Sequence, residues 1–459
     1  MVDAHADAST STTPAAMPPL LPEPRRPLLA VAPMIDVTDR HFRMLIRCVS
    51  PLPTLWTEMT WDRAILYNAP SEPEYALNKN EPRKSVESLI GFSAEERPLV
   101  MQLGGAEPER LARAAAHAAR RGYDEVNLNC GCPAQTRGRA RNCYGARLMF
   151  EPQRVADCCA AMIAAVGGRC PVTVKCRLGV DDRDTYEELH EFVRVVAAVG
   201  VTHFIVHARK AILGLDTVKN RSVPPLRHEW VLRLMDDFPA LKFTLNGGVT
   251  SLAAAAELLV RGVHGVMIGR RSSADPYMYA AAASVYGHGE AGPSRREVLE
   301  RYMEYATRAQ AANWEEEDRP EAVTRRLLTP LHGLFANVNS NAKWRRQLCA
   351  AMQDRARLAS EPVAEIIRAC LATSGLTADV LDARPSLPAP KPPPTTVEQA
   401  AAAAETRPDG TSPTSVTAST RARESPVTHT PPSAPALAWL ASVQSLLGCG
   451  ACVRQVTHS

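Results

Sequence analysis

The stretch Val172-Thr173-Val174-Lys175 is an apolar run that ends on a lysine, and seven further runs in the chain repeat its pattern. Stretches with the spacing of amphipathic helices, such as Pro108–Arg121 and Val155–Val166, lie between them, and several end at glycine, as helices commonly do. Near-continuous apolar strands that alternate with helices predict a parallel sheet covered on both faces. The eight runs are Leu28–Met34, Thr54–Met59, Leu99–Leu103, Glu125–Asn129, Val172–Lys175, Phe204–His207, Phe243–Leu245 and Val266–Ile268.

The number of these units and the residues at their ends favour a closed barrel over a doubly wound open sheet. Eight strand–helix units in about 250 residues match the size of a (β/α)8 barrel. A barrel brings the carboxyl ends of its strands to one rim, whereas an open sheet spreads them along a line. We therefore predict an α/β fold with a (β/α)8 TIM barrel. The polar or reactive residues at or just after the run ends are Met34, Glu58, Gln102, Asn129, Lys175, His207, Asn246 and Arg270.

Composition and pattern divide the rest of the chain into three further parts. Of the 37 prolines in 459 residues, 18 lie in residues 1–27 and 381–459, which predicts disordered segments over residues 1–27 and 379–459. The barrel is expected over residues 28–290. Residues 291–378 keep the helical spacing of apolar residues without strand-like runs, so a C-terminal all-helical domain is expected there.

The overall composition excludes several classes of protein. No apolar run approaches the length of a membrane span, and the acidic, apolar-poor N-terminus does not match a secretory signal. The 12 cysteines are scattered, which predicts reduced thiols rather than a disulfide framework, and Cys449 and Cys452 stand too isolated for a metal site. We expect a cytoplasmic monomer that binds neither a membrane nor a metal ion. An organellar transit peptide remains the open alternative for its location.

The net charge of +4 conceals a concentrated basic segment. Residues 319–357 contain eight lysines and arginines and two acids, so their net charge is +6. A basic face of this kind can hold the phosphates of a nucleic acid. A solvated helix face is the alternative that charge alone leaves open.

Two glycine-containing corners follow the last two predicted strands. Asn246-Gly247-Gly248 ends the seventh and Gly269-Arg270 ends the eighth. In (β/α)8 barrels these two loops often bind phosphate, because glycine lets backbone N–H groups approach closely and an arginine adds a charged contact. The pair of corners favours a phosphorylated cofactor over two ordinary turns.

Three strand-end side chains suit a flavin. A rim lysine such as Lys175 would stabilise negative charge on a reduced flavin ring, unless it forms an ion pair with Glu58 or another acid. His207 would contact the cofactor, or else be a core histidine whose hydrogen bonds are satisfied. Gln102 offers both a donor and an acceptor to a pyrimidine-like ring edge, although a structural role is equally compatible with its position.

The stretch Asn127-Leu128-Asn129-Cys130-Gly131-Cys132-Pro133 carries the most specific signal. Strand alternation places Asn127 and Asn129 on one face and Cys130 on the other. Cys132 follows the strand between glycine and proline, where a thiol can act as nucleophile or acid. We therefore take Cys132 as the candidate catalytic residue.

With these motifs assembled, residues 28–350 resemble the flavin-dependent tRNA-dihydrouridine synthases, and within them the A-type subfamily. Other flavin-binding barrels, such as dihydroorotate dehydrogenases, bind the cofactor in a similar way, but they lack this Cys-Pro loop together with a basic helical domain. The segments that carry the resemblance are Ala32–Arg40, Thr57–Met59, Gln102–Gly105, Asn127–Pro133, Val172–Lys175, His207–Lys210, Asn246–Gly248, Gly269-Arg270, Leu334-Phe335 and Lys343–Arg346.

The resemblance implies an enzyme that uses FMN, with NADPH as reductant, to reduce a tRNA uridine to dihydrouridine. Hydride would go to C6 of a flipped-out uracil and Cys132 would protonate C5, at D-loop positions 20 and 20a. The implied FMN contacts are Pro33, Met34, Ile35, Gln102, Lys175, His207, Asn246, Gly247, Gly248, Gly269 and Arg270. The implied tRNA contacts are Asn129, which would position the uracil, and Lys219, Arg221, Lys343, Arg345 and Arg346.

The chain departs from the family pattern in places, and two other functions stay open. Cys130 replaces the usual valine, residues 134–142 are longer with extra arginines, and residues 69–97 look like an inserted polar loop. A non-catalytic tRNA-binding or chaperone-like protein would not need Cys132, Lys175 and His207 together. A flavin oxidoreductase for a free pyrimidine would not need the basic segment.

Overall fold

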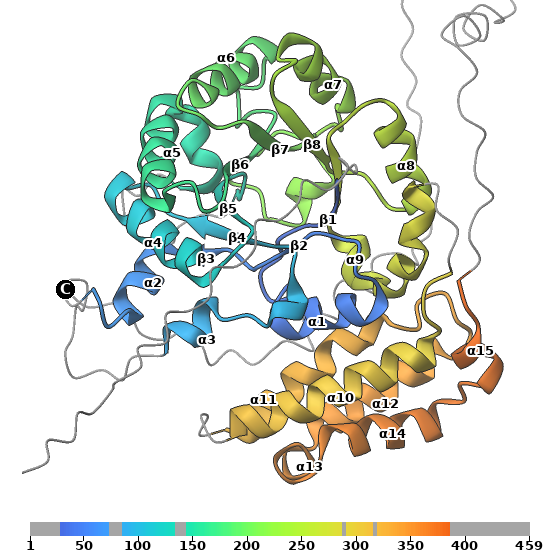
Figure 1. Cartoon of the computed structure of the whole chain (residues 1–459). Coiled ribbons are helices and arrows are strands. Elements are labelled where there is room, and N and C mark those ends of the chain that lie inside the picture. The colour runs from blue at the N-terminus through green and yellow to red at the C-terminus, as the bar shows by residue number, and fades with distance from the viewer. Residues whose placement is uncertain (1–27, 73–84, 134–143, 287–290, 315–318, 386–459) are drawn as a thin grey trace, which may run out of the picture. The chain divides into compact units, whose positions relative to one another are not determined.

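The computed structural model describes residues 28–72, 85–133, 144–286, 291–314 and 319–385 (Figure 1). All of them belong to one compact unit, residues 1–391, while a second unit, residues 392–459, lies outside the described part of the chain. The predictions of disorder for residues 1–27 and from residue 386 onward therefore fall outside the described residues. In the described ranges, no helix has both the length and the apolar character that crossing a membrane requires.

The strands form one parallel sheet in the order β1-β9-β8-β7-β6-β5-β4-β2, with β3 beside β4 (Figure 1). Thr54 closes the ring, because its carbonyl accepts from the Val31 amide at 3.0 Å and its amide donates to Leu29 at 2.8 Å. The predicted TIM barrel is confirmed. The strands are β1 (Leu28–Val31), β2 (Leu55–Trp56), β3 (Thr60–Trp61), β4 (Leu99–Gly104), β5 (Glu125–Cys130), β6 (Val172–Arg177), β7 (His203–His207), β8 (Lys242–Asn246) and β9 (Gly265–Ile268).

Helices surround the barrel, and strand alternation separates two cores. Outward side chains such as Leu103 and Val174 join the large core beneath the helices, whereas Val100 and Ile205 belong to a small core inside the barrel. The helices are α1 (Arg40–Val49), α2 (Asp62–Asn68), α3 (Val86–Ile90), α4 (Pro108–Arg121), α5 (Pro152–Val166), α6 (Tyr186–Ala197), α7 (His228–Asp237), α8 (Leu252–Val260) and α9 (Arg270–Ala274), with short 3-10 segments η2 (Ala94–Glu96), η3 (Gly145–Phe150), η4 (Lys219–Arg221) and η5 (Pro276–Tyr286).

The first two strands are shorter than predicted. β1 ends at Val31, and the Met34 carbonyl instead accepts from the amides of Val37 and Thr38 in a turn. The second strand ends at Trp56. Beyond it the Thr57 side-chain hydroxyl, rather than a backbone carbonyl, accepts from the Gln102 backbone amide, and the same hydroxyl donates to the Glu58 carbonyl. Met34 and Glu58 thus lie in loops beyond the strands. The 69–97 loop is also not all irregular, since α3 and η2 lie in its described part.

The helical region follows the barrel along the chain and packs against α1. The His41 ring of α1 shares a 2.8 Å hydrogen bond with the Tyr305 hydroxyl, and both groups are buried. Asp382 accepts from Arg296 at 2.6 Å, so this region extends past residue 378, where we predicted its end. Its elements are α10 (Arg295–Trp314), α11 (Pro320–Leu328), η6 (Thr329–Gly333), α12 (Asn341–Gln353), α13 (Arg355–Ser360), α14 (Val363–Ser374) and α15 (Ala378–Asp382).

Candidate active site at the barrel rim

The carboxyl ends of β4 to β8 bring the predicted strand-end side chains together at one rim. Asn129 stands opposite Lys175 in the sheet register, and His207 stands opposite Asn246. Gln102 on β4 is joined to Asn129 by a 2.9 Å side-chain hydrogen bond. All five occupy inward-pointing positions, because their outward neighbours belong to the core beneath the helices.

Lys175 is held by an amide rather than by an acid. Its Nζ donates to Asn246 Oδ1 at 3.0 Å, and Asn246 Nδ2 in turn donates to the Met267 carbonyl at 2.9 Å. Among the described residues Lys175 forms no ion pair with Glu58 or another acid, and Glu58 accepts from the Asp36 amide. Burial lowers the pKa of the Lys175 ammonium group to about 8, and the positive charge of Arg177 adds to the effect.

Several arginines add positive charge beside Lys175. Burial lowers the pKa of Arg177 to about 10, and repulsion from Arg221 reinforces the shift. Burial also lowers the pKa of Arg221, with Arg270 as the next cause. Cys132 lies beside this group, because Arg177 Nε donates to the carbonyl of the preceding residue, Gly131, at 3.0 Å. This rim is therefore suited to hold negative charge.

His207 is a buried histidine without a complete set of partners. Burial, and then the charges of Arg177 and Lys175, hold its pKa well below the ordinary value, so the ring is neutral. Its Nδ1 atom is buried and has no hydrogen-bond partner among the described residues. The alternative of a satisfied core histidine is therefore wrong for this atom, which is available to a ligand.

The predicted glycine corners lie next to His207 and at the start of α9. Gly247 and Gly248 have φ angles of 104° and 74°, which favour glycine. A Cβ on Gly248 would lie 2.4 Å from the Leu226 side chain, whereas a Cβ on Gly269 would meet only Ala32 at 3.7 Å. The open side of Gly269, the unpartnered His207 nitrogen and the surrounding cations together fit a phosphorylated, anionic cofactor.

The loop that carries Cys132 is fixed from both sides. Asn129 Oδ1 accepts from the amides of Gly131 at 2.9 Å and Cys132 at 3.0 Å, and Arg177 Nε donates to the Gly131 carbonyl at 3.0 Å. Cys130 is fully buried in the outer core, on the face opposite Asn129 as strand alternation predicts, whereas Cys132 lies beyond the strand and is half-buried. Arg137, Arg139 and Arg141 of the extended loop lie outside the described residues.

The other predicted contact residues are spread over the rim and the helical region. Pro33, Met34 and Ile35 form the turn after β1, where Ile35 is 55% exposed, and Lys219 and Arg221 lie in η4 after β7. The remaining three lie apart from the rim on α12, where Lys343 and Arg346 are exposed and Arg345 is half-buried.

Sequence reasoning missed several polar side chains inside the barrel. Asn127 and Thr173 are buried beneath the rim and hydrogen-bond to each other at 2.9 Å. Arg177 at the end of β6 was also given no role, although it contacts the Cys132 loop directly. The period-two alternation that placed Asn127 beside Asn129 also assigns Thr173 and Arg177 to the inward face together with Lys175.

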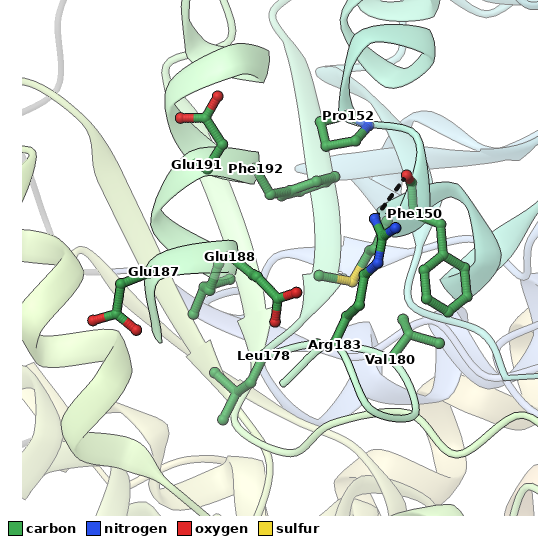
Figure 2. Close-up of a pocket in the computed structure, with 12 residues that line it drawn as sticks. Phe150, Pro152, Leu178, Val180, Arg183, Glu187, Glu188, Glu191 and Phe192 are labelled. Atoms are coloured by element: carbon green, nitrogen blue, oxygen red, sulfur yellow. Dashed lines mark hydrogen bonds between the residues drawn. The ribbon is translucent and has the colours of Figure 1, made fainter. Parts of the chain in front are cut away.

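A pocket of about 310 Å³ lies beside the starts of α5 and α6 (Figure 2). It is lined by η3, the loop after β6 and the start of α6, and Arg183 reaches across it to donate to the Phe150 carbonyl. None of the predicted site residues lines this pocket. Within the described ranges, no group of three histidine, cysteine, aspartate or glutamate side chains is placed to hold a metal ion.

Comparison with known proteins agrees with the geometry of the rim. The family model described as dihydrouridine synthase (Dus) matches residues 30–370. The chain is 41% identical over 323 residues to tRNA-dihydrouridine(20/20a) synthase of Synechocystis sp., which covers 70% of this chain and 88% of that protein. Proteins with the same description from Shewanella oneidensis (41% over 321 residues; 70% and 87%) and Xanthomonas campestris pv. campestris (42% over 307 residues; 66% and 84%) match similarly. The chain therefore belongs to the dihydrouridine synthase family.

Proposed function

We propose that the protein reduces the C5–C6 double bond of a D-loop uridine in tRNA to 5,6-dihydrouridine, with FMN as cofactor and NADPH as reductant. The observation that carries this proposal is the half-buried Cys132, held beside a group of rim cations within a dihydrouridine synthase fold. The description shared by the similar proteins supports uridines 20 and 20a as the targets.

The rim residues fit FMN, which when bound would supply the hydride for C6 of the uracil and be renewed by NADPH. Gly247, Gly248, Gly269 and Arg270 would hold its phosphate by backbone N–H groups and one guanidinium group. His207 would contact the FMN through its neutral imidazole ring. The ring system would be held by the remaining proposed contacts, which are Pro33, Met34, Ile35, Gln102, Lys175 and Asn246.

The protein supplies the proton and the electrostatic stabilisation. The Cys132 thiol would donate a proton to C5 of the uracil, as general acid. Lys175, oriented by Asn246, places a positive charge where negative charge develops during the reduction. Asn129 would position the uracil, and its side-chain oxygen also accepts a hydrogen bond from the Cys132 amide.

Basic groups beside the rim and in the helical region would bind the tRNA backbone. A uridine can enter the rim only after leaving its stack, so the tRNA must be held on either side of the flipped base. Lys219 and Arg221 lie in η4 near the rim, and Lys343, Arg345 and Arg346 lie on α12. We assign catalysis to residues 28–290 and tRNA binding to residues 291–378.

Flavin binding tests this function directly. The purified protein is expected to be yellow, or to become so on reconstitution with FMN, and NADPH should bleach its visible absorbance. A protein that takes up no FMN would contradict the proposal. A protein that binds tRNA but whose flavin NADPH cannot reduce would instead support the non-catalytic alternative.

A further inference from the structure

A chain of buried side-chain hydrogen bonds crosses the barrel interior beneath the rim. Thr173 Oγ1 donates to Glu125 Oε1 at 2.5 Å, and Asn127 Nδ2 donates to Thr173 Oγ1 at 2.9 Å. Gln102 Nε2 donates to Asn127 Oδ1 at 2.9 Å, and Asn129 Nδ2 donates to Gln102 Oε1 at 2.9 Å. We call these five residues the interior chain. The proposed function uses only its upper members, Gln102 and Asn129.

The upper end of the interior chain holds the catalytic loop. Asn129 Oδ1 accepts from the amides of both Gly131 and Cys132, and its Nδ2 also lies 3.3 Å from the Met59 sulfur. Both lone pairs and both hydrogens of the Asn129 amide are thus engaged. The position of the Cys132 backbone therefore depends on which way the Asn129 amide faces.

Chemistry at the two ends fixes the direction of every bond in the interior chain. Backbone N–H groups can only donate, so Asn129 must present its oxygen to the loop and its nitrogen to Gln102. An ionised carboxylate can only accept, so Thr173 must donate to Glu125 and accept from Asn127. The four members other than Glu125 are at most 9% exposed, so little water is present to replace a lost partner.

Apolar side chains at these positions would cost less desolvation free energy on burial than this set of amides does. Elsewhere the barrel interior is filled by side chains such as Ala30, Trp56 and Met267. Burying a polar network costs desolvation free energy. It also specifies a single arrangement of the side chains, because each amide has one orientation in which all its hydrogen-bond partners are satisfied. Here the members lie on β4, β5 and β6, next to the loop that follows β5.

We propose that Glu125, Thr173 and Asn127 are positioning residues that fix the Cys132 loop from below, where Asn127 and Glu125 precede Gly131 by four and six residues along the chain. This inference rests on the proposed role of Cys132 as the proton donor. The three residues touch neither the uracil nor the cofactor. They act by setting the orientation of the Gln102 and Asn129 amides.

The test compares Thr173→Val with Thr173→Ser in the full-length protein with FMN bound. Valine fills the same space without a hydroxyl, so Asn127 loses its acceptor, whereas serine keeps both bonds. In the valine variant, hydrogen exchange of the Gly131 and Cys132 amides should be about 10-fold faster. The kcat for dihydrouridine formation should fall about 10- to 100-fold, with the KM for tRNA within about twofold of wild type. The serine variant should resemble wild type in all three.

Thr324→Val is the matched control for a buried threonine. Thr324 is fully buried in α11 and accepts from Gln310 Nε2 at 3.0 Å, so its loss destabilises the fold without touching the interior chain. We expect no local change in exchange at Gly131 or Cys132 in this variant. If it affects them as much as Thr173→Val does, general destabilisation explains the result and the proposal is overturned.

Two other outcomes separate this inference from the proposed function. A Thr173→Val protein whose loop exchanges and turns over like wild type would overturn the inference alone. If wild-type protein forms no dihydrouridine, the proposed function fails, and the exchange measurement still decides whether the interior chain holds the loop.

Discussion

The Lys175 ammonium group on β6 donates to the Asn246 side-chain oxygen on β8 across 3.0 Å, although the two residues are 71 positions apart in sequence. This bond spans the intervening strand β7, whose last residue is His207. It fixes a buried positive charge at the point where the rim offers an unpartnered histidine nitrogen. The position of this positive charge at the rim therefore depends on the curvature of the barrel, which brings side chains of β6 and β8 together.

Replacing Lys175 with methionine should stabilise the flavin-free protein in a pH-dependent manner. Between pH 8 and 10.5 the unfolded lysine keeps its proton while the folded one has lost it, so the unfolded state binds more protons and wild-type stability rises with pH there. The gain from Lys175→Met should be on the order of 2 kcal/mol at pH 7 and shrink by pH 10. Urea unfolding of both proteins at the two pH values measures it, and an equal gain at both would show that Lys175 is not buried as described.

Gly248→Ala should weaken flavin binding, whereas Gly262→Ala should leave it unchanged. Both glycines have positive φ angles, of 74° and 94°, so alanine costs about 1 kcal/mol of backbone strain at either position. Only at Gly248 would the new Cβ also displace a neighbour, because it would lie 2.4 Å from the end of the exposed Leu226 side chain, which must move. Titration with FMN, followed by flavin fluorescence, separates the two, and tight binding by both variants would remove this corner from the cofactor site.

Cys132→Ala should reduce dihydrouridine formation by at least about 100-fold, because the proposed acid is lost. Cys130→Ala should keep the rate within about threefold. Its thiol is fully buried in the outer core, so the expected effect is a loss of about 1–2 kcal/mol in unfolding free energy. Rate assays and urea unfolding on both variants check this, and the reverse pattern would transfer the catalytic role to Cys130.

Removal of the charges at Lys343, Arg345 and Arg346 should weaken tRNA binding. Each phosphate contact releases counterions, so the slope of log affinity against log salt should become shallower by about 2–3 for the triple alanine variant. The control removes Arg308 and Arg368, which pair with Glu304 and Glu365 on the surface of the same helical region. Filter binding at several salt concentrations measures the slopes, and identical slopes would mean that α12 presents only a solvated basic face.

The sequence predicted what depends on local pattern and missed what depends on contacts between distant strands. Pro108–Arg121 is a helix with the predicted limits, because Pro108 suits a first turn and Gly122 ends it with a φ of 87°. Strand alternation correctly placed Cys130 on the face opposite Asn129, and Cys132 was told apart from it because it lies beyond the end of the strand. The pairing of Lys175 with Asn246 rather than Glu58 could not be predicted, because it depends on the closure of the barrel and on how the turn after β1 occupies Glu58.

The reaction proposed for the rim is reduction of a D-loop uridine, with NADPH as reductant, FMN as hydride carrier and Cys132 as proton donor. It is tested most directly by incubating the FMN-bound protein with NADPH and an unmodified tRNA transcript, then mapping nuclease fragments by mass spectrometry. We predict a gain of two hydrogen masses for each uridine reduced on the fragment that contains positions 20 and 20a, and no gain with Cys132→Ala. The claim is contradicted if NADPH reduces the flavin but no uridine gains mass, or if the gain lies outside the D loop.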